Sequence, residues 1–262
     1  MLRGFQLFGL FSRISILNEM QYRANFFIQV FQSALTLTTG LIVMNVVFSY
    51  TQTLGGWTHS ELLAIYGVFF LMSGIVGALI FPNIWAFMED VREGRLDFIL
   101  TKPEDAQVLI SVRQLALWRL VDVIIGVVVL AIALTQIGQQ GSWLQALAFG
   151  TALLMGAVIL YSIILIASTA AFWSVRVWEM MEMIGSIFQA GRWPVGIYPD
   201  WLRLGLTYLI PVAFAVTVPA EALTGRLTPQ TLLFTFFFTI FLAFISRKIW
   251  FYGLKNYTGA SA

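Results

Sequence analysis

The sequence of 262 residues contains no cysteine, a single histidine and little charge. Without cysteine the chain can form neither a disulfide nor a thiolate zinc site, and His59 alone cannot build a metal or haem centre. Charged residues make up 11% of the chain, whereas about 25% is usual in soluble domains. So few charges cannot cover a water-exposed surface, and the composition excludes a soluble enzyme.

Hydrophobic residues, in contrast, make up 59% of the chain. Because a helix rises 1.5 Å per residue, about 20 apolar residues cross the hydrocarbon core of a bilayer. The composition therefore predicts an all-α integral membrane protein, with lipids around it. The net charge is +2 and the basic residues are scattered along the chain, so we expect no nucleic-acid partner.

Long runs without charge predict five of the membrane spans. The run from Val123 to Val175 is too long for one helix, and the polar turn at 136–142 divides it in two. The five spans are expected at about 24–49, 62–86, 114–135, 143–173 and 230–250.

Region 176–226 is ambiguous, because it carries charges and four of the seven prolines. Lysine and arginine collect on the cytoplasmic side of a membrane. They precede the first span, separate the second from the third and follow the last, whereas the loops near 50–60 and 136–142 have none. Both termini are therefore expected in the cytoplasm, which requires an odd number of crossings between 176 and 229.

We expect a sixth span at about 177–192, followed by an extracytoplasmic re-entrant helical hairpin at 193–226. A crossing at 204–220 is the less favoured rival, because Pro211 lies in its middle. Residues 1–22 have apolar side chains at helical spacing and predict an amphipathic helix on the inner surface. The rival there is a cytoplasmic extension of the first span. The whole chain, 1–262, is predicted to be one transmembrane domain.

The sequence offers no energy source of its own. A phosphate-binding loop needs Gly-Lys-Ser/Thr, but Lys102, Lys248 and Lys255 all lack a preceding glycine. The most deeply placed carboxylate, Asp122, lies near a span end, where Arg119 is a suitable partner three residues earlier. We therefore predict that the chain is not an enzyme, and that it holds no metal and no cofactor.

Charge is concentrated in residues 89–105, inside a segment at 87–112 that should be cytoplasmic. This stretch holds nine charged residues, interleaved with Leu96, Ile99 and Leu100 at helical spacing, before Pro103 ends the element. A short helix with exposed leucines and mixed charge suits a docking surface. The alternative is a solvated loop whose helix rests on the lipid.

The run Glu-Gly-Arg-Leu-Asp-Phe-Ile-Leu-Thr-Lys-Pro at 93–103 resembles the cytoplasmic coupling segment of type-2 ABC (ATP-binding cassette) exporter permeases. The later motifs Gly-Arg-Trp-Pro at 191–194, Tyr-Pro at 198–199, Ile-Pro at 210–211 and Pro-Ala-Glu-Ala-Leu-Thr-Gly at 219–225 are similar to a bacterial branch of small permeases in the same family.

The resemblance implies a permease subunit of an ATP-driven exporter in the bacterial cytoplasmic (inner) membrane. Two permeases, identical or related, would form the path, and two separate ATPase subunits would bind ATP and Mg²⁺. The implied ATPase-coupling residues are Glu93, Gly94, Arg95, Leu96, Asp97, Leu100, Lys102 and Pro103. Trp178 and Glu179 would form a secondary cytoplasmic contact. The hairpin that caps the path on the outer side would contain Pro194, Pro199, Pro211, Pro219 and Glu221.

Two other functions stay open at the level of sequence: a secondary transporter or channel, and a non-transporting membrane anchor of a complex. The substrate-binding residues are not identified. Neutral polar side chains at Gln32, Thr39 and Asn45 favour an amphipathic or lipid-like cargo over a small ion. Small residues around Gly74 and Gly156 are expected to pack spans of the same chain together.

Overall fold

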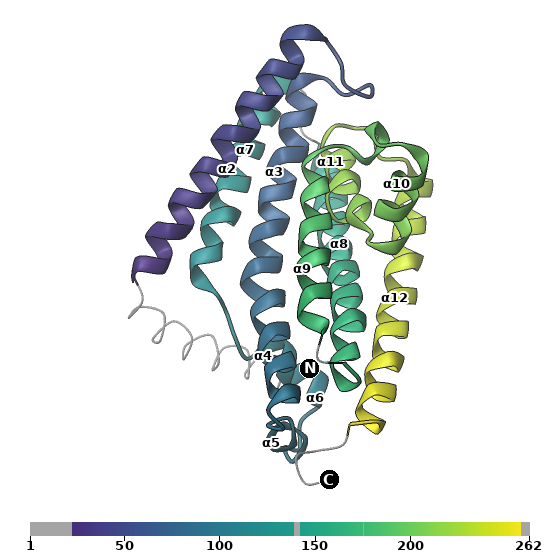
Figure 1. Cartoon of the computed structure of the whole chain (residues 1–262). Coiled ribbons are helices and arrows are strands. Elements are labelled where there is room, and N and C mark those ends of the chain that lie inside the picture. The colour runs from purple at the N-terminus through teal and green to yellow at the C-terminus, as the bar shows by residue number, and fades with distance from the viewer. Residues whose placement is uncertain (1–22, 139–141, 175, 258–262) are drawn as a thin grey trace.

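The computed structural model describes residues 23–138, 142–174 and 176–257, and this part of the chain is helical apart from its loops (Figure 1). Five helices are long and apolar enough to cross a membrane, and each overlaps one of the five ranges predicted from uncharged runs, although the third begins at Leu117 rather than at 114. The amphipathic helix predicted for residues 1–22 lies outside the described residues.

The first of these helices is α2 (Arg23–Tyr50). The second is continuous and consists of α3 (His59–Ile75), the π-helical turn Val76–Ile80 and α4 (Phe81–Arg92). The third contains α7 (Leu120–Ile137). The other two are α8 (Trp143–Thr169) and α12 (Pro229–Lys255). Shorter helices complete the fold: α5 (Asp97–Leu100), α6 (Ala106–Val112), α9 (Val177–Phe188), α10 (Asp200–Leu204) and α11 (Val218–Leu223).

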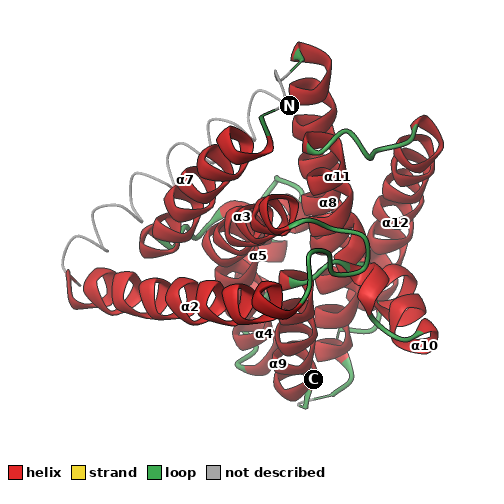
Figure 2. Cartoon of the chain, turned by 90° about the horizontal axis from the view of Figure 1, so that it is seen from above, coloured by secondary structure: helices red, strands yellow, loops and turns green. Residues whose placement is uncertain are grey.

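Residues 59–92, which we call the long helix, form the centre of the molecule. Twelve of the 17 residues of α3 are buried. Seen from above, α2 and α7 lie on one side of α3, and α8, α11 and α12 lie on the other (Figure 2). The α2–α3 loop and the α10–α11 hairpin lie toward one end of the bundle, the hairpin end, and α5 lies at the opposite elbow end (Figure 1).

Glycines set the close approach of the long helix to α7 and of α8 to the second arm of the hairpin. A Cβ atom added at Gly74 would lie 2.7 Å from the backbone nitrogen of Val123 in α7. One added at Gly156 in α8 would lie 2.8 Å from Cα of Ala215. Small residues permit such packing between membrane helices, so the predicted role of both glycines within one chain is confirmed.

Helix α9 covers most of the range predicted for the sixth span, and a 3₁₀ turn at Gln189–Arg192 extends it. With 12 residues it is shorter than the five candidate spans. Its crossing of the membrane therefore stays a prediction.

The hairpin contains two helical arms, Asp200–Leu209 and Ala213–Leu223, which meet at an angle of 76°. Pro211 lies in the break. It has no N–H to donate, and it forces Ile210 before it out of the helical conformation, to φ −122° and ψ 88°. The arms are either a broken span or a re-entrant pair, so the rival crossing at 204–220 does not form a straight helix.

Candidate functional site: a charged elbow and the cavity beside the long helix

Residues 89–113, which we call the elbow, form the charged cluster at the elbow end of the molecule. The first residues of the predicted segment at 87–112 still belong to α4, which ends at Arg92. The chain then reverses at Gly94, whose φ of +70° lies in the left-handed region that glycine adopts without strain. The single turn α5 follows, and α6 leads back toward the bundle.

A buried carboxylate organises the start of the elbow. Asp90 is 8% exposed and accepts hydrogen bonds from Arg113 Nη1 at 2.5 Å and from Arg95 Nε at 3.2 Å. Its backbone carbonyl also accepts the N–H of Arg95 at 2.8 Å. Arg95, predicted as a docking residue, is therefore a structural partner of Asp90 as well, and it also pairs with Glu93. Its side chain is still 48% exposed.

The expectation of exposed leucines is wrong for Leu96 and right for Leu100. Leu96 is completely buried, because it precedes the turn α5 and packs into the main core. Ile99 is buried with it, whereas Leu100 is 41% exposed. Phe98, which the sequence-based site did not include, is the most exposed apolar residue of the elbow at 72%. Phe98 and Leu100 are the exposed apolar side chains of α5, and we call this pair the apolar knob.

The side chains of Asp105 and Gln107 join the elbow to α12 and α8. Its carboxylate caps α6 by accepting the N–H groups of Gln107 and Val108 at 2.9 and 3.2 Å. Arg247 of α12 donates to this carboxylate and, at 2.6 Å, to the side chain of Gln107. Gln107 in turn donates to the hydroxyl of Tyr161 in α8 at 3.2 Å. The hydrogen bond from Arg247 holds the pKa of Asp105 below its usual value.

The other predicted cytoplasmic contact lies at the start of α9. The Trp178 ring stacks on Trp85 of the long helix, with centroids 4.8 Å apart and planes 19° from parallel. Glu179 beside it is exposed. Trp178 therefore has a packing role in the chain itself.

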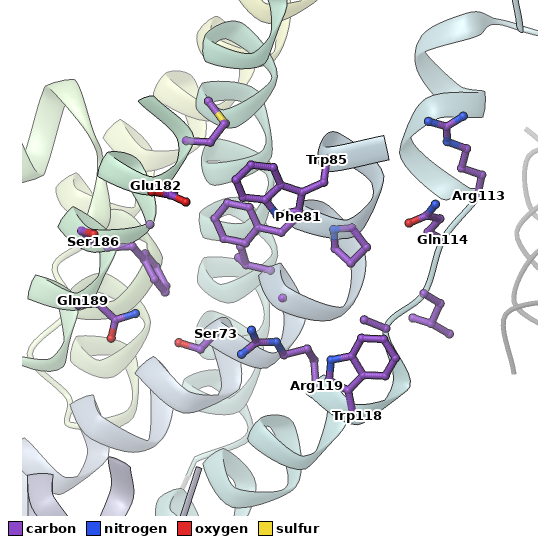
Figure 3. Close-up of a pocket in the computed structure, with 18 residues that line it drawn as sticks. Ser73, Phe81, Trp85, Arg113, Gln114, Trp118, Arg119, Glu182, Ser186 and Gln189 are labelled. Atoms are coloured by element: carbon purple, nitrogen blue, oxygen red, sulfur yellow. The ribbon is translucent and has the colours of Figure 1, made fainter. Parts of the chain in front are cut away.

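A cavity of about 970 Å³ lies between the long helix, α9 and the segment from Arg113 to Arg119 (Figure 3). Helix α9 has two faces that explain its place here. Val177, Met181, Ile184 and Phe188 recur at helical spacing and are buried. Glu182 and Ser186 on the other face, together with Gln189 of the following 3₁₀ turn, line the cavity. In Figure 3 they lie across from Trp118 and Arg119, with Phe81 and Trp85 between.

A smaller cavity of about 130 Å³ shares Ser73, Arg119 and Gln189 with the larger one. Asp122 lines it and is 5% exposed. Arg119 is a distant partner of Asp122 at 3.8 Å, whereas two residues of α2 contact the carboxylate more closely. Gln29 donates to it at 3.1 Å, and the hydroxyl of Ser33 forms the shortest bond. Asp122 therefore ties α2 to α7, a role that sequence spacing could not reveal.

The neutral polar residues expected along a path separate into two groups. Gln32 lines the smaller cavity. Asn45 instead bonds to His59 Nε2 at 3.1 Å, and Thr39 donates to the carbonyl of Leu35 in its own helix at 2.8 Å. Within the described ranges, no three histidine or carboxylate side chains are grouped to hold a metal ion.

Three of the four predicted hairpin prolines lie where the chain turns: Pro194 and Pro199 flank the short turn Val195–Ile197, and Pro211 lies at the bend. Pro219 instead lies near the start of α11, inside the second arm. Glu221 of α11 lines an open groove of about 460 Å³ between the hairpin and α12.

Comparisons with known proteins bear on the whole chain. No curated protein and no solved structure gives a significant match. The family model described as "ABC-2 family transporter protein" matches residues 34–261, which include the elbow, the cavity and the hairpin. The chain therefore belongs to the ABC-2 family of transporter membrane proteins.

Proposed function

We propose that this chain is the permease subunit of an ATP-driven exporter, and that a separate ATPase subunit binds it through the elbow. The observation that carries the proposal is the exposed pair Phe98 and Leu100, set among charged side chains on a segment that is fastened to the core. An apolar knob can fill a groove of a partner, and charges around it fix its orientation. The charged neighbours assigned to this contact are Glu93, Arg95, Asp97 and Lys102.

A movement of the elbow would be transmitted to the long helix, α12 and α8. The Asp90 contacts with Arg95 and Arg113 join the elbow to the long helix. The bonds among Asp105, Gln107 and Arg247 join it to α12, and those of Tyr161 join it to α8. Because a hydrogen-bonded, packed segment moves as a unit, docking of an ATPase would shift these helices together. Leu96 supports this transmission from inside the core and does not touch the partner.

The cavity beside α9 is the proposed site at which this chain contacts the cargo. A polar face with Glu182, Ser186 and Gln189 would be costly against lipid, and a second permease facing this opening would close it. The walls combine aromatic rings with polar groups, which suits an amphipathic cargo. A second permease, identical or related, completes the path in this proposal.

The proposed orientation places the elbow and both termini in the cytoplasm and the hairpin outside a bacterial inner membrane. The distribution of lysine and arginine supports it, because the α2–α3 loop, which has none of these residues, lies at the other end of the bundle from the elbow. Two ATPase subunits with bound ATP and Mg²⁺ would serve the pair of permeases.

The test compares two exposed aromatic residues at opposite ends. Phe98 is 72% exposed in the elbow and Trp201 is 73% exposed in the hairpin. We expect Phe98→Asp to abolish co-purification of the ATPase and cargo-stimulated ATP hydrolysis, and Trp201→Asp to leave both intact. An ATPase that binds the Phe98→Asp variant as well as the unchanged chain would overturn the docking assignment, and transport without any ATPase would overturn the function.

A further inference from the structure

Arg226, the last residue of the hairpin, contacts the first turn of the long helix. Its guanidinium donates from Nε to Glu61 Oε1 at 2.9 Å and from Nη2 to Glu61 Oε2 at 2.8 Å. Nη2 also donates to the carbonyl of Gly56 at 2.8 Å. The same guanidinium lies over the ring of Trp57, 4.6 Å from its centroid. One side chain therefore joins the hairpin to the α2–α3 loop and to α3.

Glu61 and Arg226 are each held in place by further hydrogen bonds within their own segments. Glu61 accepts the backbone N–H of Thr58 at 2.8 Å and thereby completes the capping box of α3. Arg226 follows Gly225, whose φ of +72° turns the chain, and its own N–H donates to the carbonyl of Glu221 at 2.9 Å. A two-pronged contact between prearranged partners is stronger and more specific than an ordinary surface ion pair.

We propose that Arg226 is a latch that fastens the hairpin to the long helix and holds the hairpin end of the molecule closed. The elbow lies at the other end of the same helix. A movement of the long helix must therefore either carry the hairpin with it or break the contacts of Arg226. The latch follows from these contacts alone, and only its part in cargo release rests on the proposed function.

The hairpin contains a matched control. Arg203 pairs with Asp200 at 2.6 Å. Because both residues belong to α10, this ion pair lies within the hairpin and does not join it to another helix. Arg203→Gln and Arg226→Gln remove the same charge from the same hairpin. Only the second removes a contact between the hairpin and the long helix.

Distances between spin labels test the latch directly, and the absence of natural cysteine makes the labelling clean. Labels are placed at Tyr50→Cys, 89% exposed beside the α2–α3 loop, and at Trp201→Cys in the hairpin. The full-length chain is measured in lipid nanodiscs. We expect one narrow distance distribution in the otherwise unchanged chain and in Arg203→Gln, and an additional longer population in Arg226→Gln.

An unaltered distribution in Arg226→Gln would overturn the latch, as would an equal change in both variants. Arg226→Lys serves as a second measurement, because it keeps the charge but loses the two-pronged contact. The latch predicts a smaller longer population for Arg226→Lys than for Arg226→Gln, and an equal one would contradict it. No ATPase or cargo is needed, so these results stand apart from the tests of the proposed function.

Discussion

Two leucines four residues apart in the elbow have opposite environments. Leu96 is fully buried and Leu100 is 41% exposed. Removing buried methyl groups costs both transfer free energy and a cavity term, whereas truncating an exposed side chain costs little.

Leu96→Ala should therefore lower the free energy of unfolding by about 2–5 kcal/mol. Leu100→Ala should change stability little but weaken binding of the ATPase. Thermal unfolding in detergent, with ATPase co-purification measured in parallel, checks both. Equal losses of stability in the two variants would show that Leu96 is not the internal anchor of the elbow.

The contact between Asp105 and Arg247 has a defined dependence on pH. Arg247 lowers the pKa of Asp105, so the folded chain binds this proton less readily than the unfolded chain does. The stability that the pair contributes is present above the ordinary pKa of 3.8 and is lost as the pH falls through the lowered value.

Asp105→Asn should remove part of the loss of stability on acidification below about pH 4. The effect should be small, because the Asp105 side chain is 36% exposed and water screens the pair. Melting temperatures of the two chains between neutral and acidic pH measure it. Parallel curves for both chains would contradict the assigned contact.

At the scale of elements, glycine controls the distance between α3 and α7. A Cβ atom at Gly126 would lie 2.5 Å from the backbone nitrogen of Leu71, which cannot move without shifting a helix. Gly150 in α8 is a matched control, because a Cβ atom there meets nothing within 4 Å.

Gly126→Ala should destabilise the bundle, although alanine favours a helix over glycine by about 1 kcal/mol. Gly150→Ala should leave stability unchanged or raise it, since only the helix propensity changes. Melting temperatures of the two variants in the same detergent measure both changes in stability. A more stable Gly126→Ala variant would mean that α3 and α7 are not in close contact there.

Sequence periodicity and charge predicted the elements better than their contacts. Uncharged runs located the five long helices, because an apolar stretch of sufficient length has no other stable arrangement in a bilayer. The pattern could not show that α4 continues to Arg92, nor that α9 has only 12 residues. Helix ends depend on local capping, which hydropathy does not contain.

The candidate site was predictable in place but not in detail. The density of charge located the elbow, yet helical spacing assigned Leu96 to the exposed face when the brief turn α5 buries it. The partners of Asp122 and Asp105 come from α2 and α12, which are distant in sequence. No local pattern reports such long-range contacts, and the same holds for Arg226 and Glu61.

At the scale of the whole molecule, the long helix joins every proposed functional part. Its C-terminal end carries the elbow, its middle lines the cavity, and its first turn is fastened to the hairpin. A continuous, buried helix transmits displacement between its ends because its packed neighbours resist bending. In the proposed function, an external ATPase holds this helix by the elbow from the cytoplasmic side.

Single-cysteine labelling can show on which side of the membrane the elbow lies, because the chain has no cysteine of its own. Phe98→Cys and Trp201→Cys are exposed to a membrane-impermeant maleimide in intact cells and in inside-out vesicles. We predict that Phe98→Cys reacts only in the inside-out vesicles and is protected when the ATPase is bound, while Trp201→Cys reacts only in intact cells. Labelling of Phe98→Cys from outside intact cells would show that the elbow faces away from the cytoplasm and would overturn the docking of a cytoplasmic ATPase there.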